Sequence, residues 1–225
     1  MKIDEIIEQV RSSHGVERTT QVVLNEYEQG ERCFLKIADA MVDTKPIDFD
    51  RETITKEIEV LIDWLYQMDR VKIDYRKGIL FKGDVGRGKT FLMKVFKHFM
   101  QVDKHRYRSG DKELSMNLII VNAKKIAGEY QDAENGGYRV IERYANTPVL
   151  CIDDIGAEGI SMQYGNKINV VAEIIDLREE RSRITFGTTN VEILSKNYDD
   201  RTISRMYSLF NIVVINHQKD YRKEK

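Results

Sequence analysis

Residues 78–100 read GILFKGDVGRGKTFLMKVFKHFM, and this stretch decides the fold. An apolar run gives way after Lys82 to a short segment with three glycines, and apolar residues at helical spacing begin after Lys89. Glycine lets a backbone turn sharply and bring successive N–H groups toward one point. The pattern therefore predicts a strand, a loop that gathers N–H donors, and a helix whose positive end completes an anion site.

The loop has the spacing G-x-x-x-x-G-K-[ST], from Gly83 to Thr90. In this spacing Lys89 reaches the terminal phosphates of a nucleotide, and the Thr90 hydroxyl can ligate Mg²⁺. The order G-x-x-G-x-G followed by lysine excludes a dinucleotide-binding fingerprint. We expect ATP with Mg²⁺ to contact Gly83, Asp84, Val85, Gly86, Arg87, Gly88, Lys89, Thr90 and Phe91. The alternative interpretation is a chance glycine turn before a helix.

Four more apolar runs follow, at residues 117–123, 148–154, 184–190 and 211–216. Segments with helical spacing separate the strands, at residues 89–100, 123–131, about 167–180 and 191–209. Strands that alternate with helices predict an α/β fold with a parallel sheet covered on both faces. Residues 102–115 and 131–139 are polar and are expected to be loops. The first is locally basic, which suits either plain exposure to water or contact with nucleic-acid phosphates.

Asp153 and Asp154 end the third predicted strand. The carboxyl end of a parallel strand faces the crevice where such sheets bind ligands, so Asp153 is expected to hold Mg²⁺ opposite Thr90, mostly through water. Asp154 would orient or deprotonate the attacking water. An ordinary turn or helix cap is the alternative for such a pair. Asn190 ends the next strand and would hold that water or touch the γ-phosphate, unless it only caps the helix that follows.

Residues 1–72 have helical spacing and no chemical motif, so we expect a helical domain there and the nucleotide-binding core at residues 73–225. The formal net charge of −1 gives no overall attraction to nucleic acid. The two cysteines, Cys33 and Cys151, have no metal or redox spacing. No apolar run approaches the roughly 20 residues of a membrane span. A reduced, cytoplasmic setting without membrane contact is the expectation.

These motifs resemble those of the AAA+ ATPases, and most of all the DnaC/DnaI helicase-loader branch, whose relatives include the IstB transposition helper. The resemblance spans about residues 75–225 and is carried by GDVGRGKTFL (83–92), VLCIDDIGAEG (149–159), TFGTTN (185–190) and YDDRTISRMYSLF (198–210). It implies a five-stranded parallel P-loop NTPase core. It also implies that this core lacks the C-terminal helical lid of most AAA+ proteins, and that the small N-terminal domain grips the partner.

The resemblance further implies that Arg201 and Arg205 lie one turn apart on a helix. Arg205 would be the arginine finger, which reaches in trans to the γ-phosphate held by a neighbouring subunit. An ion pair with a nearby acid is the alternative for both arginines. Arg222, in the terminal NHQKDYRKEK, resembles a basic residue that loaders place near the nucleotide. Asp154 stands where AAA+ enzymes most often have glutamate, which suggests a slow, switch-like ATPase.

The favoured function is therefore an ATP-dependent helicase loader. It would bind ATP, Mg²⁺ and single-stranded DNA, self-associate through Arg205, and control a DnaB-type replicative helicase. One alternative is an IstB-like transposition helper that binds duplex DNA and a transposase. Others are a metabolic phosphotransferase and a nucleotide-binding adaptor with negligible hydrolysis.

Overall fold

The computed structural model describes residues 27–42, 55–102, 106–109, 112–132, 134–163, 166–190 and 197–216. At its centre is a five-stranded sheet whose neighbouring strands all pair parallel. The spatial order is β4 (Leu118–Asn122), β5 (Val149–Ile155), β8 (Ile184–Thr189), β1 (Gly78–Lys82) and β9 (Phe210–Val214). The predicted α/β fold and its five strands are confirmed. Because every strand is parallel, all carboxyl ends lie at one edge of the sheet.

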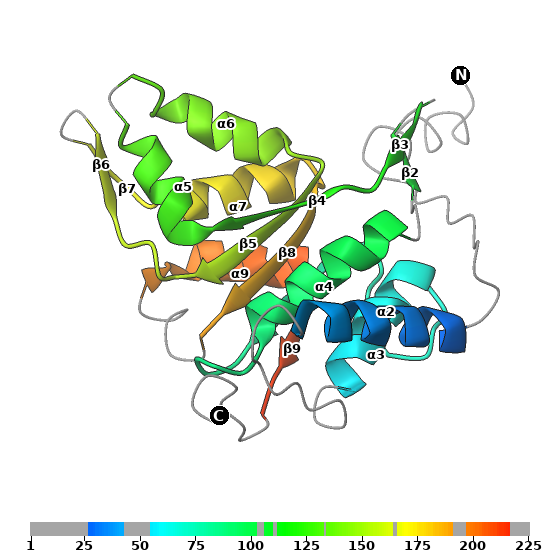
Figure 1. Cartoon of the computed structure of the whole chain (residues 1–225). Helices are drawn as coiled ribbons and strands as arrows, with labels where there is room; N and C mark the ends of the chain where they lie inside the picture. Colours follow the sequence, from blue (N-terminus) through cyan, green and yellow to red (C-terminus); the bar gives the residue numbers. More distant parts are fainter. Residues whose placement is uncertain are drawn as a thin grey trace.

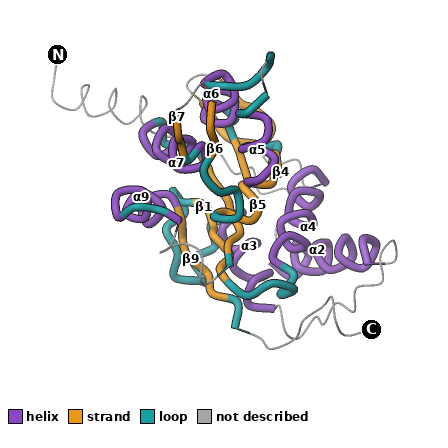
Figure 2. The backbone as a smooth tube through the Cα atoms, turned by 90° about the vertical axis from the view of Figure 1, so that its left-hand side faces the viewer, coloured by secondary structure: helices purple, strands orange, loops and turns teal. Residues whose placement is uncertain are grey.

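Helices cover both faces of the sheet, so the chain forms three layers (Figure 2). One face carries α4 (Lys89–Val102), α2 (Tyr27–Val42) and α3 (Thr55–Tyr66), and the other carries α5 (Ala123–Tyr130), α6 (Tyr138–Asn146), α7 (Val170–Glu180) and α9 (Asp200–Leu209) (Figure 1). Strand residues alternate between the two apolar cores. Ile79 and Phe81 of β1 belong to the first core, and Leu80 belongs to the second.

Aromatic side chains hold α2 and α3 against the same face as α4. The rings of Phe34 in α2 and Phe99 in α4 lie edge to face, with centroids 5.6 Å apart. Trp64 of α3 meets Phe186 of β8 in the same way at 4.7 Å. Such pairs contribute about 0.5–1.5 kcal/mol each beyond the area that they bury. The described helices of the N-terminal region therefore share one hydrophobic cluster with the sheet.

The apolar residues at helical spacing in α3, which are Ile58, Leu61, Ile62 and Leu65, are all buried, and Ile54, which has the same spacing, lies outside the described residues. The division into a partner-binding domain (1–72) and an ATPase core (73–225) stays a prediction. Residues 1–26 and 43–54, which belong to the predicted helical domain, lie outside the described residues.

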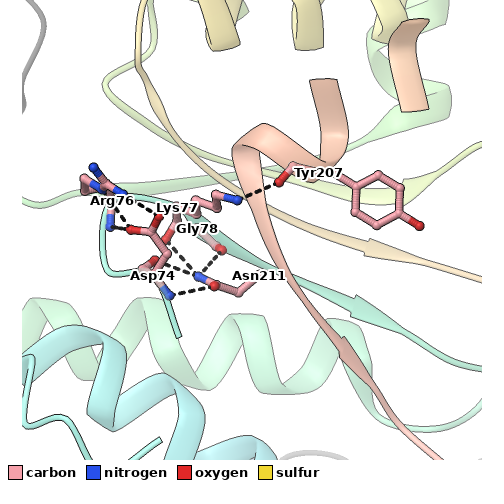
Figure 3. Close-up of polar contacts among 6 residues, drawn as sticks. All are labelled: Asp74, Arg76, Lys77, Gly78, Tyr207 and Asn211. Atoms are coloured by element: carbon pink, nitrogen blue, oxygen red, sulfur yellow. Dashed lines mark hydrogen bonds and ion pairs between the residues drawn. The ribbon is translucent and has the colours of Figure 1, made fainter. Parts of the chain in front are cut away.

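The segment that leads into β1 is fastened to the start of β9, at the amino edge of the sheet (Figure 3). Asn211 Oδ1 accepts the backbone N–H of Asp74 at 2.8 Å, and its Nδ2 donates to the carbonyl oxygens of Asp74 at 2.8 Å and Gly78 at 3.2 Å. Lys77 Nζ donates to the carbonyl of Tyr207 at 2.9 Å, in the last turn of α9, where a cation is favourable. This edge lies opposite the predicted site.

The structure differs from the sequence prediction in two polar segments. Residues 102–115, expected to be a loop, contain an antiparallel hairpin of β2 (Arg106–Ser109) and β3 (Lys112–Ser115). A second hairpin, β6 (Ser161–Gln163) with β7 (Asn166–Ile168), precedes α7, which begins at Val170 and not near residue 167. Strands of three or four residues are too short to show an apolar alternation in the sequence.

Two helix boundaries also differ. Helix α6 was not expected, and it begins at Tyr138, directly after a backbone turn at Gly137 with φ of 72°. Helix α9 begins at Asp200, where the prediction extended a helix back to residue 191; residues 191–196 lie outside the described part. Asp199 ends that extension because its side chain accepts the N–H of Thr202 as an N-cap. Within the described residues, no helix is long and apolar enough to cross a membrane.

Candidate functional site

The predicted site residues of three neighbouring strands meet at the carboxyl edge of the sheet. Strand β8 lies between β5 and β1. The loop after β1, the acids that end β5, and Asn190 after β8 are therefore side by side, although they are far apart in the sequence. Ligands of open parallel sheets bind at this edge. The strand order therefore brings together the three groups of residues that the sequence analysis assigned to one site.

The phosphate loop, residues 83–90, takes its shape from glycines. Gly86 and Gly88 have φ values of 86° and 79°, in the left-handed region that other residues rarely adopt. At Gly83 a Cβ would lie 2.8 Å from the carbonyl oxygen of Ile215, so the strand leaves room only for glycine. The loop runs directly into α4. The N–H groups of that helix's first turn therefore adjoin the loop, as an anion site requires.

Lys89 lies across this loop and is only 5% exposed. Its Nζ donates to the carbonyl oxygens of Gly83 and Asp84, both at 2.7 Å, and to Asn190 Oδ1 at 3.1 Å. The structure thus brings Lys89 and Asn190 together. These acceptors are uncharged, and a phosphate oxygen would be a stronger partner for an ammonium group. The helix that Asn190 was alternatively expected to cap would begin at Val191, which lies outside the described residues.

Asp153 connects the loop to the two neighbouring strands. Its Oδ1 accepts hydrogen bonds from the hydroxyls of Thr90 at 2.7 Å and Thr188 at 2.8 Å. The Asp153 side chain is nearly buried, at 7% exposed. Thr90 belongs to α4 and Thr188 to β8, so one carboxylate holds the start of the helix and the end of the strand in a fixed relation.

A β-bulge places the second acid. Ile152 pairs with Gly187 and Ile155 with Thr189, so β5 has one residue more than β8 in this interval. Asp154 absorbs the extra residue with a φ of 58°, a strained conformation for a residue other than glycine. Its N–H does not find a strand carbonyl and instead donates to the Thr188 hydroxyl at 2.8 Å. Asp153 and Asp154 thereby both keep their places at the edge.

Asn122, at the end of β4, holds the side chain of Asp154. Its Oδ1 accepts the N–H of Lys124 at 3.0 Å and caps α5, which leaves Nδ2 to face the site. Nδ2 donates to Asp154 Oδ2 at 3.2 Å. The helix cap therefore fixes the orientation of the amide, and the amide fixes the carboxylate.

The donor set beside the loop fits Mg²⁺. The Thr90 hydroxyl and the Asp153 carboxylate are hard oxygen ligands, the type that Mg²⁺ prefers. The two groups lie within hydrogen-bonding distance of each other. Among the described residues, no group of three or more His, Cys, Asp or Glu side chains could hold a metal ion by itself. A site of one hydroxyl and one carboxylate is the kind that Mg²⁺ uses when phosphates supply further ligands.

The turn after Asp154 braces the helix that carries the two arginines. Glu158 accepts the N–H of Gly156 at 2.7 Å and the hydroxyl of Tyr198, while Asn197 Nδ2 donates to the Gly156 carbonyl. Burial raises the pKa of the Glu158 carboxyl and, likewise, that of the Tyr198 hydroxyl. Asp199, the next residue, caps α9. Asp154 and α9 are therefore joined by one hydrogen-bonded turn.

The arginines of α9 contact α7 of their own chain. Arg205 Nη1 donates to the Asp176 carbonyl at 3.0 Å, and its Nε lies 3.5 Å from the Asp176 carboxylate. Arg201, which is 71% exposed, lies 3.8 Å from the same carboxylate. The predicted helical placement, one turn apart, is present. The structure does not bring Arg205 to its own phosphate loop, and Arg222 lies outside the described residues.

Sequence reasoning missed Asn122, Thr188 and Glu158. Thr188 stood in the quoted TFGTTN stretch, and its hydroxyl position one residue before the strand end was a usable signal. Asn122 also ends an apolar run, as Asn190 does, and that parallel could have found it. Glu158 gave no signal of its own, because its partner Tyr198 is 40 residues away.

No protein-family model and no curated protein matches the sequence. Solved structures do match. The DnaI structure aligns with a TM-score of 0.56 and 20% identity, over 78% of this chain and 88% of the DnaI chain. The DnaC helicase loader aligns with a TM-score of 0.55 and 18% identity, over 76% of this chain and 95% of the loader. DnaA from Aquifex aeolicus with bound AMPPCP gives 0.52 and 16%, over 77% of this chain and 50% of DnaA.

The chain shares the fold of the DnaI, DnaC and DnaA structures. At such identities the likeness establishes the fold. It agrees with the five-stranded parallel sheet and with the phosphate loop after β1. AMPPCP, the ligand of the DnaA structure, is an ATP analogue, so this fold accommodates such a nucleotide in DnaA.

Proposed function

We propose that this chain binds ATP with Mg²⁺ at the carboxyl edge of the sheet and hydrolyses it slowly. The observation that carries the proposal is the contact of Thr90 with Asp153 at 2.7 Å, directly beside the loop that holds Lys89. A phosphate loop alone would suit many nucleotide-binding proteins. A carboxylate that touches the loop's own hydroxyl residue, with a second acid next to it, suits phosphoryl transfer to water.

Each residue has one task in this proposal. The loop N–H groups and Lys89 bind the phosphates, for which Lys89 exchanges its carbonyl partners for charged oxygens. Thr90 and Asp153 hold Mg²⁺, which supplies neutralisation of phosphate charge when bound. Asp154 accepts the proton of the attacking water, and Asn190 orients the water or the γ-phosphate.

The rate is proposed to be low because Asp154 has a shorter side chain than glutamate, so it reaches less far toward a water molecule. The alternative that the following experiment separates from this proposal is a nucleotide-binding adaptor with negligible hydrolysis.

Hydrolysis by purified protein tests the proposal directly. Asp154→Asn is expected to keep ATP affinity and to lower turnover by about 10²-fold or more, because an amide cannot accept the proton. Asn122→Ala frees the carboxylate from its fixed orientation, and turnover is expected to fall by about tenfold with unchanged ATP affinity. Phosphate release and calorimetric titration with ATP measure the two quantities.

Asp200→Asn is the matched control, since Asp200 is an exposed acid in the first turn of α9. Its turnover should equal that of the wild type. Wild-type turnover in Asp154→Asn would mean that another residue prepares the water. Undetectable turnover in the wild type, with normal ATP binding, would favour the adaptor.

The proposed partner is a DnaB-type replicative helicase on single-stranded DNA. The proposed location is the cytoplasm, where such a helicase acts. This proposal rests on the fold shared with DnaI and the DnaC helicase loader. Partner recognition is assigned to residues 1–72, because the AAA+ core accounts for the nucleotide. Since α3 packs on the sheet through Trp64, the contact is proposed to involve the part of that region before α2.

Affinity capture of a DnaB-type helicase tests this assignment. The full chain is expected to retain the helicase, and a chain that begins at residue 27 is expected to lose it while it still binds ATP. Equal capture by both chains would contradict the role of the N-terminal region. Absence of capture together with preference for duplex over single-stranded DNA would favour the transposition helper instead.

Arg205 is proposed to act in trans on the nucleotide of a neighbouring subunit. To do so it must leave Asp176 and Glu179, the acids of α7 that it contacts at 3.5 Å and 4.0 Å. Partly exposed ion pairs of this kind contribute only about 0–1 kcal/mol. A contact with a transferring phosphoryl group contributes far more, so the exchange is favourable when a neighbour offers the nucleotide.

Arg205→Ala should therefore bind ATP normally and lose about 10²-fold or more in turnover. Mixed with Lys89→Ala subunits, which have the arginine but no nucleotide, it should recover part of the activity that each variant lacks alone. Arg201→Ala removes the more exposed arginine from the same acid and serves as the control. Normal turnover and a lowered melting temperature in Arg205→Ala would make the arginine a structural tie between α9 and α7.

A further inference from the structure

Arg87, inside the phosphate loop, is a partly buried cation whose hydrogen-bonding capacity is largely unused. Its side chain is only 16% exposed. Its Nε and Nη1 atoms are fully buried and have no hydrogen-bond partner. Its Nη2 donates to Asp84 Oδ2 at a long 3.3 Å, and the Asp84 side chain is 67% exposed. A pair with so exposed an acid contributes about 0–1 kcal/mol.

The contrast with Arg178 shows how this fold treats an arginine that only stabilises it. Arg178 is completely buried. It donates to the Thr185 hydroxyl and to the carbonyl oxygens of Tyr144, Ala145, Thr147 and Ile184. Burial lowers the pKa of Arg178 to about 9, so it stays charged at neutral pH and is held by these oxygens. Arg178 is thus fully surrounded by acceptors, and Arg87 is not; Arg183, outside the loop, has one such unpaired buried atom, Nε, whereas Arg87 has two.

Unpaired donors of a buried guanidinium are unfavourable, because water has been removed and nothing has replaced it. Such a group persists in a fold when a ligand supplies the missing acceptors. The place of Arg87 identifies the ligand's chemistry. It lies between Gly86 and Gly88, the two glycines whose positive φ angles shape the loop, and directly precedes Lys89. The oxygens that arrive at this loop are those of a phosphate chain.

We infer that Arg87 is a second cation of the phosphate site, whose guanidinium donates to phosphate oxygens of the bound nucleotide. The inference rests on the proposed function and deepens it. Lys89 already holds three oxygens of the protein, whereas Arg87 has donors in reserve. Bound phosphate satisfies these donors, and in the free protein they are a cost. Removal of Arg87 therefore affects affinity and stability in opposite directions.

Two measurements on Arg87→Met test this. Titration calorimetry with ATP and with inorganic tripolyphosphate, both with Mg²⁺, should show affinities lower by about 10- to 100-fold, the loss that corresponds to one charged hydrogen bond. The melting temperature of the nucleotide-free protein should be unchanged or higher, because methionine fills a similar space without unpaired donors. Arg87→Lys keeps the charge and should lose less affinity than Arg87→Met.

Arg76→Met is the matched control, since Arg76 is 90% exposed and pairs with Asp74 at the opposite edge of the sheet. It should bind both ligands like the wild type. A lowered melting temperature with unchanged ATP affinity in Arg87→Met would make Arg87 a structural residue and overturn the inference. Weaker ATP binding with unchanged tripolyphosphate binding would move the contact to the base and overturn the phosphate assignment. Failure of the wild type to bind ATP would overturn the proposed function itself, which is a separate result.

Discussion

One carboxylate oxygen, Oδ1 of Asp153, joins the parts on which this site depends. It accepts the hydroxyls of Thr90 and Thr188, and so ties the first turn of α4 to the ends of β5 and β8. Thr188 in turn accepts the N–H of Asp154 and stabilises the bulge that presents the second acid. Loss of the central carboxylate would release the loop, the bulge and the neighbouring strand together.

A left-handed backbone and unpaired buried donors occur at this edge, as they also do at a few other places in the described residues. Asp63, fully buried in α3, accepts the N–H groups of Arg70 and Val71 and the hydroxyl of Tyr75. In contrast, Asp154 has a left-handed backbone and Arg87 has unpaired donors. Folds tolerate such local costs mainly where function requires them. At the carboxyl edge these two features coincide with the predicted ligand site.

Local signals made much of the molecule predictable. Continuous apolar runs marked all five strands, and the glycine spacing marked the loop, because both depend on neighbouring residues alone. The hairpin of β2 and β3 was missed because its strands are short and polar, although the Ser-Gly-Asp sequence at residues 109–111 is a turn signal. The hold of Asn122 on Asp154 depends on β4 lying beside β5, which sequence spacing does not reveal. For Arg205 the sequence allowed an ion pair or a finger, and the own-chain contact with Asp176 became visible only in the folded chain.

The central claim is that the loop at residues 83–90 binds the phosphates of ATP through Lys89. Calorimetric titration of the folded Lys89→Ala protein with ATP and Mg²⁺ tests it most directly, with Lys94→Ala, an exposed lysine of the same helix, as the control. The account predicts that the wild type and Lys94→Ala bind ATP alike and that Lys89→Ala shows no measurable binding, while all three have similar circular dichroism spectra. Normal ATP affinity in a folded Lys89→Ala protein would contradict the account.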